Sequence, residues 1–295
     1  MIPAHAPVLL AETVALLDPS RGGIFVDCTI GLGGHAAALL DAGAGRVIGL
    51  DRDPRALELA RERLSPWGDR VELVHADYRD LAAVLADRGI AAIDGALADL
   101  GVSSMQLDEA ARGFSFRSDG PLDMRMDTTR GETAAGMLAA VDEHELADVI
   151  YRFGEERKSR RVARAIVEAR DEAPIETTAR VAAIVRRAAG GGTYQRLDPA
   201  TRTFQALRIW VNRELDGLDT FVVDAVRALT VGGRLVVIAF HSLEDRIVKH
   251  TLRLLERGEG LVRVLTKKPV TAAEAELAGN PRARSAKLRA VERVA

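Results

Sequence analysis

Aspartates that follow short apolar runs are the residues of this 295-residue chain whose positions most favour chemistry. Asp27 and Asp51 end two such runs, and the glycine-rich segment Gly31–His35 lies between them. Asp51 comes 20 positions after Gly31, the spacing at which an acid meets ribose hydroxyls in dinucleotide-binding folds. Because glycine has no Cβ, such a loop lets a ligand approach the backbone closely. The pattern predicts a site for an adenosine-containing cofactor.

The acids around the loop indicate which cofactor to expect. Asp27 comes just before the loop, where it would repel a pyrophosphate but could engage the charged methionine end of S-adenosylmethionine. A third apolar run leads to Asp77 and Tyr78, which offer a carboxylate and an aromatic face for an adenine ring, and a fourth ends at Asp99. We therefore favour S-adenosylmethionine. A nicotinamide dinucleotide stays open, because the glycine loop also fits the dinucleotide fingerprint.

Each of these residues also has an ordinary structural interpretation. Asp27 could cap a turn, and Asp51 could be a helix N-cap. His35 opens a helical run and could cap it or face solvent, while Tyr78 could belong to the core. Their joint placement after consecutive apolar runs favours a binding site over these separate explanations.

Short apolar segments alternate with helical patterns in the first third of the chain. We expect strands over 23–28, 46–51, 70–76 and 93–100, and helices over 35–42, 54–64 and 81–87. Such alternation predicts an α/β fold with a parallel sheet and helical crossovers. Ligands bind such open sheets at the carboxyl ends of the strands, where the aspartates stand.

The alternation stops after Ser104. Helical patterns follow over 143–153, 159–170 and 178–188, and one long helix over 199–229 leads to a strand over 234–240. We expect a discontinuous cofactor-binding domain, residues 1–105 and 201–295, interrupted by a mostly helical insertion, residues 106–200.

Composition limits the remaining possibilities. The net charge of −2 means that any nucleic-acid surface must be local. The single cysteine, Cys28, suits a reducing compartment and is expected to be a buried apolar residue. We see no secretory signal in residues 1–7 and no run long enough to cross a bilayer, so we expect a cytoplasmic protein with no membrane partner. No metal site is expected.

Sequence blocks along nearly the whole chain resemble the S-adenosylmethionine-dependent methyltransferases of the MraW type, which modify the exocyclic amine of a cytosine in 16S ribosomal RNA. Besides the glycine loop, the matching blocks are His5–Leu10, Asp51–Pro54, Asp99–Asp108, Arg112–Phe116, Asp119–Asp127, Gly154–Arg157, Thr201–Asn212, Phe240–Arg246 and Asn280–Ser285. The resemblance implies a Rossmann-like class I methyltransferase sheet, with the helical insertion as an RNA-recognition domain. It also implies a target cytosine in the decoding region of the small ribosomal subunit.

The resemblance further implies the residues that contact the cofactor. These are Gly33, Gly34, His35, Asp51, Tyr78, Asp99 and Gln106. Catalysis would consist mainly of aligning the amine with the methyl group, with Asp99 accepting from the amine hydrogens. His241 could take the proton that the methylated amine sheds, or could be a structural histidine at a strand end.

RNA contacts must come from local basic and aromatic surfaces. Phe114 and Phe116 could stack on an unpaired base, and basic clusters lie over 157–164 and in a basic tail, Arg282–Arg293. Further candidates are Arg202, Arg208, Asn212, Arg282 and Arg284. Charge runs are often only solvated faces. A non-catalytic RNA-binding assembly factor is therefore the alternative to an enzyme, although the intact loop and the segment 99–106 argue against it.

Overall fold

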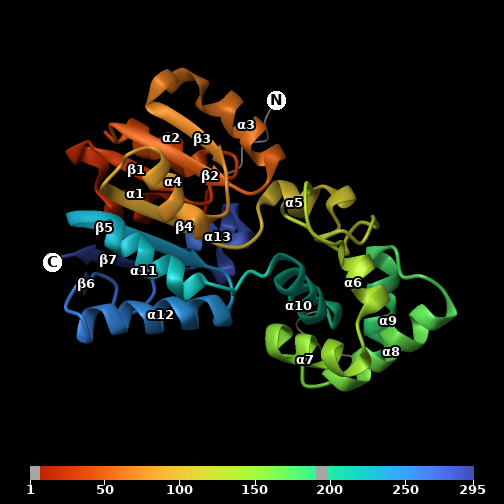
Figure 1. The fold of residues 1–295 in the computed structure, drawn as a ribbon. Helices are drawn as coiled ribbons and strands as arrows, with labels where there is room; N and C mark the ends of the chain where they lie inside the picture. Colours follow the sequence, from red (N-terminus) through yellow and green to blue (C-terminus); the bar gives the residue numbers. More distant parts are fainter. Residues whose placement is uncertain (1–6, 191–197) are drawn as a thin grey trace. The chain divides into compact units, whose positions relative to one another are not determined.

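The computed structural model describes residues 7–190 and 198–295, so His5 and Ala6 of the first matching block lie outside the described residues. The chain divides into two compact units (Figure 1). Unit 1 comprises residues 1–101 and 215–295, and unit 2 comprises residues 102–214. None of the described helices is long and apolar enough to span a membrane.

Unit 1 contains a seven-stranded sheet in the order β3-β2-β1-β4-β5-β7-β6 (Figure 1). Its strands are β1 (Ile24–Asp27), β2 (Arg46–Asp51), β3 (Val71–His75), β4 (Ile93–Asp99), β5 (Leu229–Ala239), β6 (Val262–Val264) and β7 (Lys287–Arg293). Strands β1 to β5 pair in parallel, whereas β7 runs antiparallel to β5 and β6. The α/β fold with a parallel sheet and helical crossovers, expected from the sequence, is confirmed for β1 to β5.

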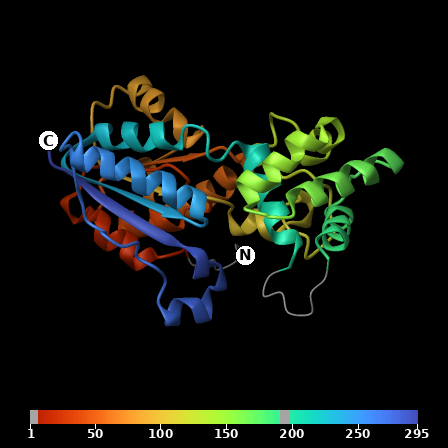
Figure 2. The same ribbon diagram turned by 90° about the horizontal axis from the view of Figure 1, so that it is seen from below.

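Helices cover both faces of this sheet. Helices α4 (Leu81–Asp87), α11 (Leu218–Ala228) and α12 (Ser242–Arg257) share one apolar core with the sheet, and α11 and α12 pack side by side (Figure 2). Helices α1 (Leu10–Leu17), α2 (Gly34–Asp41) and α3 (Pro54–Leu64) share a second core on the opposite face. Helix α13 (Glu274–Gly279) precedes β7. Layers on both faces bury the central strands β1, β2 and β4, which explains why their sequences are mostly apolar.

Unit 2 is helical and has its own core. It contains α5 (Ser104–Asp108), α6 (Ala134–Ala140), α7 (Glu143–Gly154), α8 (Ser159–Glu172), α9 (Thr178–Ala189) and α10 (Ala200–Asn212). The three helices expected over 143–188 are confirmed as α7, α8 and α9. Each of the three places an apolar face in the core and charged residues outside, which is the pattern of a surface helix.

Two expectations about the second half of the chain were wrong. The single helix expected over 199–229 is two helices, because Arg213 adopts a left-handed conformation (φ 51°) that ends α10, and Gly217 (φ 68°) precedes α11. The basic tail contains strand β7, which the sequence did not predict.

The compact units divide the chain at 101/102 and 214/215, whereas the expected domain boundaries were 105/106 and 200/201. The second difference arises because Phe204 and Leu207 of α10 lie in the core of unit 2.

Candidate active site

Three aspartates stand at the carboxyl edge of the sheet in unit 1. Asp51, Asp27 and Asp99 lie at the ends of β2, β1 and β4, which are neighbours in that order. Asp27 is buried, at 1% exposure, and its Oδ1 accepts a hydrogen bond from the Thr29 amide (3.2 Å). Among the described residues, Asp27 Oδ2 and Asp99 Oδ1 are buried without a hydrogen-bond partner. The edge therefore carries acceptors that the described chain leaves unused.

The enclosure of these carboxyl groups changes their acidity. Burial raises the pKa of Asp27 to about 7, with a smaller contribution from the charge of Asp51. Burial likewise raises the pKa of Asp51 to about 6. The pKa of Asp99 is raised well above its usual range by burial and then by the charges of Asp27 and Glu244, although 23% of its side chain is exposed. A bound cation would favour the ionised carboxylates, so the edge suits a positively charged ligand.

Asp51 also organises the glycine loop. Its Oδ2 accepts from the Gly31 amide (2.9 Å), and its Oδ1 accepts from the Asp53 amide (2.9 Å). A carboxylate has about four lone-pair sites, so acceptor capacity remains for two hydroxyl groups. The Asp53 side chain caps α3 by accepting from the Arg55 amide (3.0 Å), as a helix N-cap.

The next two glycines of the loop are required for packing. Gly33 has φ 75° and is the N-cap of α2, and a Cβ there would lie 2.9 Å from Leu64 Cδ1. A Cβ at Gly34 would lie 2.4 Å from Pro7 Cγ. Each position therefore needs glycine for the fold of unit 1, and a backbone contact with a cofactor stays a prediction.

His35 lies beside Asp99. Its ring is buried, with Nε2 3.0 Å from the Val8 carbonyl and Nδ1 3.9 Å from Asp99 Oδ2. Because a carbonyl oxygen only accepts, the contact with Val8 assigns a proton to Nε2. The structure thus brings the predicted residues His35 and Asp99 together.

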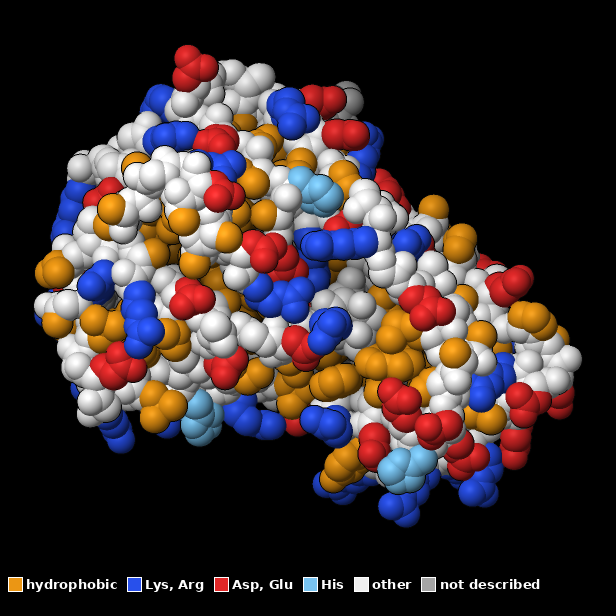
Figure 3. All heavy atoms as spheres, viewed as in Figure 1, with side chains coloured by type: hydrophobic (Ala, Val, Ile, Leu, Met, Phe, Trp, Pro, Cys, Tyr) orange, Lys and Arg blue, Asp and Glu red, His pale blue; other side chains and the backbone are white. Residues whose placement is uncertain are grey.

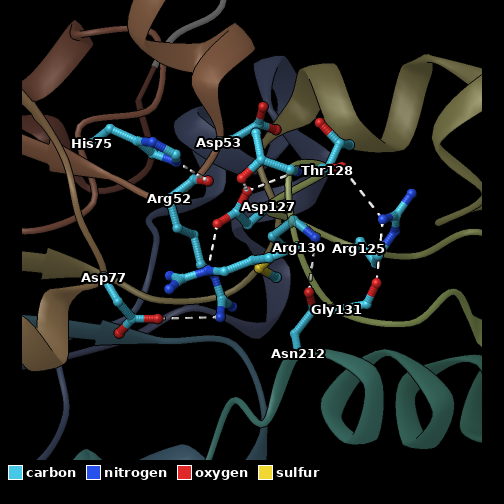
Figure 4. Close-up of polar contacts among 12 residues, drawn as sticks. Arg52, Asp53, His75, Asp77, Arg125, Asp127, Thr128, Arg130, Gly131 and Asn212 are labelled. Atoms are coloured by element: carbon cyan, nitrogen blue, oxygen red, sulfur yellow. Dashed lines mark hydrogen bonds and ion pairs between the residues drawn. The ribbon is translucent and has the colours of Figure 1, made fainter.

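Tyr78 and Asp77 follow β3. Hydrogen bonds from the guanidinium of Arg79 hold Asp77 at 2.7 and 2.8 Å, and Arg52 approaches it at 3.4 Å (Figure 4). Burial acts to raise the pKa of Asp77, but these two arginines hold it below its usual value. Asp77 is thereby engaged within the protein. Tyr78 is 8% exposed, and its ring packs edge to face against Phe221 (4.8 Å between centroids), so it also belongs to the core.

His241 stands at the N-terminus of α12, directly after β5. Its Nδ1 accepts from the Glu244 amide (3.4 Å), which makes it the N-cap of α12. Its Nε2 lies 3.1 Å from Glu244 Oε1, outside hydrogen-bond geometry, and is buried. The sequence left two roles open for His241, a proton acceptor and a structural histidine. The geometry shows a structural role, because the side chain caps α12.

Gln106 and the aromatic candidates belong to unit 2. Gln106 is buried, and its Oε1 accepts from the Ser103 amide (3.0 Å) in a capping box at the start of α5. Phe114 lies in the core of this unit. Phe116 packs edge to face on Phe204 (4.7 Å), with the Arg186 guanidinium 5.4 Å from its ring centre. Contacts of these residues with a cofactor or an RNA base stay predictions.

The polar RNA candidates differ in their surroundings. Arg202 is exposed, whereas Arg208 forms a two-pronged ion pair with Glu214 (2.8 and 2.9 Å). Asn212 is buried: it accepts from the Met126 amide (2.8 Å) and donates to the Met124 carbonyl (2.7 Å). Of the two in unit 1, Arg282 is half-buried and Arg284 exposed. Basic side chains lie among acidic ones on the viewed face (Figure 3), so no large area of one charge marks an RNA surface there.

The sheet and its acidic edge are those of a Rossmann-like class I methyltransferase. The sequence matches the MraW methylase family over residues 3–294, and the chain belongs to that family. Ribosomal RNA small subunit methyltransferase H of Sorangium cellulosum is 55% identical, covering 98% of this chain and 91% of its own. The protein of the same name from Geotalea uraniireducens is 50% identical, covering 98% of both chains. A crystallised rRNA methylase of Streptococcus thermophilus aligns over 97% of this chain and 93% of its own, at 14% identity and a TM-score of 0.41.

The protein is thus a methyltransferase that depends on S-adenosylmethionine. The residues of unit 1 fit that cofactor, because it carries a sulfonium and an ammonium group and the edge holds buried carboxyl oxygens of Asp27 and Asp99 that have no partner in the described part of the chain. Asp51 keeps acceptor capacity for a ribose. The residues around Gln106 in the sequence gave no indication of a binding role, so Gln106 was identified only by resemblance. The buried Glu244 was not predicted, because buried glutamates are rare.

Proposed function

We propose that this protein transfers a methyl group from S-adenosylmethionine to the exocyclic amine of a cytosine in the decoding region of 16S ribosomal RNA. The observation that carries the proposal is the buried acidic edge of the sheet beside the glycine loop, in a chain of the MraW methylase family. The names of the relatives, ribosomal RNA small subunit methyltransferase H, support the choice of substrate. Methylation of ribosomal RNA would place the protein in the cytoplasm.

Each residue near the edge has a proposed role. Asp51 accepts hydrogen bonds from the ribose hydroxyls, and Asp27 faces the cationic end of the cofactor. Tyr78 contacts the adenine. The remaining cofactor contacts are Gly33, Gly34, His35, Asp99 and Gln106. When bound, S-adenosylmethionine supplies a methyl group on a positively charged sulfur.

Asp99 is the proposed catalytic residue. The amine of cytosine is a weak nucleophile because its lone pair is delocalised into the ring, so the protein must hold it in line with the methyl group. Asp99 Oδ1 has no partner among the described residues and can accept a hydrogen bond from the amine. A carboxylate with a raised pKa is also the stronger base for the proton that leaves after methyl transfer. For His241 we propose a structural role as the N-cap of α12 beside this edge, since its Nδ1 already accepts a hydrogen bond from the Glu244 amide.

Basic residues of both units are proposed to hold the RNA. In unit 1, Lys287 pairs with Ala239 at the carboxyl end of β5, so Arg282 and Arg284 precede β7 at the reacting edge of the sheet. In unit 2 the basic run 157–164 is at the start of α8, with Arg157, Arg160 and Arg161 exposed. The helical insertion is proposed as the RNA-recognition domain. A cytosine amine is paired in a duplex, so the target base must be unpaired or flipped during the reaction.

The test is methyl transfer to small ribosomal subunits, and to naked 16S RNA, that lack the modification. We expect labelled S-adenosylmethionine to yield N4-methylcytidine, identified by mass spectrometry of the nucleosides. Asp99→Asn should lower the rate by about 100-fold or more, the scale of a lost general base. Asp87→Asn, at an exposed position of α4, is the matched control.

Three results would overturn the proposal. Label on neither RNA nor subunits would remove the enzymatic function and favour a non-catalytic assembly factor. Label on another base or atom would remove the cytosine amine as the target. Binding of a nicotinamide dinucleotide in place of S-adenosylmethionine, in a calorimetric titration with both, would point to an oxidoreductase.

A further inference from the structure

Glu244 is a buried glutamate in unit 1 that the proposed reaction leaves without a role. It lies in the first turn of α12 and is 2% exposed. Its Oε2 accepts from the amides of Phe240 (2.9 Å) and His241 (3.3 Å), and its Oε1 lies 3.1 Å from His241 Nε2. Burying a carboxylate is costly unless it is hydrogen-bonded, so these contacts explain how the fold tolerates it.

The backbone that Glu244 holds packs on the turn that follows Asp99. A Cβ at Gly101 (φ 97°) would lie 3.4 Å from Phe240 Cδ2, so the Phe240 ring lies next to this glycine and fills the space that a side chain there would take. The Leu100 amide also donates to the Ile238 carbonyl (2.9 Å), which joins the end of β4 to the end of β5. The Glu244 carboxylate holds the Phe240–His241 segment, and the turn after Asp99 packs on that segment. The position of Asp99 therefore depends on Glu244.

Glu244 also acts on Asp99 through its charge. Among the residues that the structure describes, the titratable groups that act on or approach Asp99 include Asp27 from β1, His35 from α2 and Glu244 from α12. Burial raises the pKa of Asp99 most, and the negative charges of Asp27 and Glu244 raise it further. Since Glu244 is enclosed, water screens this charge less than it would at the surface.

We propose that Glu244 is a positioning residue for methyl transfer: it holds Phe240 on the turn after Asp99 and places a buried negative charge that acts on the Asp99 carboxylate. The inference rests on the proposed catalytic role of Asp99. Its two parts, the packing and the charge, can be tested separately.

Glu244→Gln tests the charge, because the amide oxygen can still accept from the Phe240 and His241 amides. We expect kcat to fall about tenfold, which is less than the loss of the general base itself would cost, because Asp99 is still present. The KM for S-adenosylmethionine should change little. Removing the negative charge lowers the pKa of Asp99, so the acid limb of the pH–rate profile should move to lower pH. Asp245→Asn is the matched control, because Asp245 is the next residue of α12 but pairs with Arg289 (2.7 Å).

Phe240→Leu tests the packing without a change of charge. We expect a lower kcat and an acid limb at the wild-type pH. The proposal would be overturned if Glu244→Gln kept the wild-type kcat and the wild-type acid limb. A lowered melting temperature as the only change would overturn it as well. If Glu244→Gln does not fold, Phe240→Leu decides, and an unchanged kcat overturns the inference. If the wild type itself transfers no methyl group to RNA in the same assay, the proposed function fails instead.

Discussion

Asp27 is the residue whose replacement tests most directly why the sheet edge is acidic. The substitution Asp27→Asn keeps the shape of the side chain and the acceptor for the Thr29 amide, but removes a buried negative charge. In the absence of cofactor the ionised carboxylate destabilises the folded protein, because its Oδ2 has no partner among the described residues. With cofactor the same charge should strengthen binding. The variant should therefore be more stable and bind more weakly.

The magnitude follows from the pKa of Asp27, which is about 7 in the folded protein against an ordinary value of 3.8. Between these values the folded state holds more protons than the unfolded state, so stability falls as pH rises from about 4 to about 7 and changes little above. Three pKa units correspond to about 4 kcal/mol once the carboxylate is fully ionised, and to about 2 kcal/mol at pH 5. The cost of burying the new amide is the same at both pH values. Relative to wild type, Asp27→Asn should gain about 2 to 3 kcal/mol between pH 5 and pH 8.

The assay is urea unfolding of the cofactor-free protein at pH 5 and pH 8, followed by tryptophan fluorescence. Trp67 lies in unit 1 and Trp210 in unit 2, so a Trp210→Phe background isolates the unit that contains Asp27. Calorimetry at the same pH values should show wild-type affinity for S-adenosylmethionine rising with pH and a flatter dependence in the variant. The reasoning fails if both proteins lose stability equally between pH 5 and pH 8.

Two further substitutions test the assignment of individual residues. Asp51→Ala should weaken binding of S-adenosylmethionine about tenfold or more, the scale of lost hydrogen bonds to a charged acceptor, and an unchanged calorimetric affinity would remove the ribose role. Asn212→Ala should lower the free energy of unfolding of unit 2 by about 2 to 4 kcal/mol, because the Met126 amide and the Met124 carbonyl lose their bonds to this buried side chain. Trp210 fluorescence in urea measures that loss. Wild-type stability combined with weaker RNA binding would instead support the predicted RNA contact of Asn212.

Local sequence patterns predicted β1, β2 and β4, the strands that carry the aspartates of the site. Nearby residues alone determine short apolar runs, glycine turns and helix caps, so these features can be found in the sequence. Local patterns failed where pairing is distant. Strand β7 alternates apolar residues such as Leu288 and Ala290 with charged ones, and its sequence was interpreted only as a basic tail. The strand exists because Leu288 pairs with Ile238, 50 positions away. The end of α10 was missed for a similar reason: Arg213 carries no glycine or proline signal for its left-handed backbone.

The sequence by itself determined the order of acids and glycines, Asp27, Gly31–His35, Asp51 and Asp99, which indicated an adenosine-containing cofactor and favoured S-adenosylmethionine. The spacing of residues along a strand or turn is a local property, so it is the same in the sequence and in the folded protein. Only the tertiary structure decided that Asp27 and Asp99 have raised pKa values and buried oxygens that no group within residues 7–190 and 198–295 engages. Burial and hydrogen bonding depend on groups brought together from distant segments, such as Glu244 of α12, and no local pattern contains them.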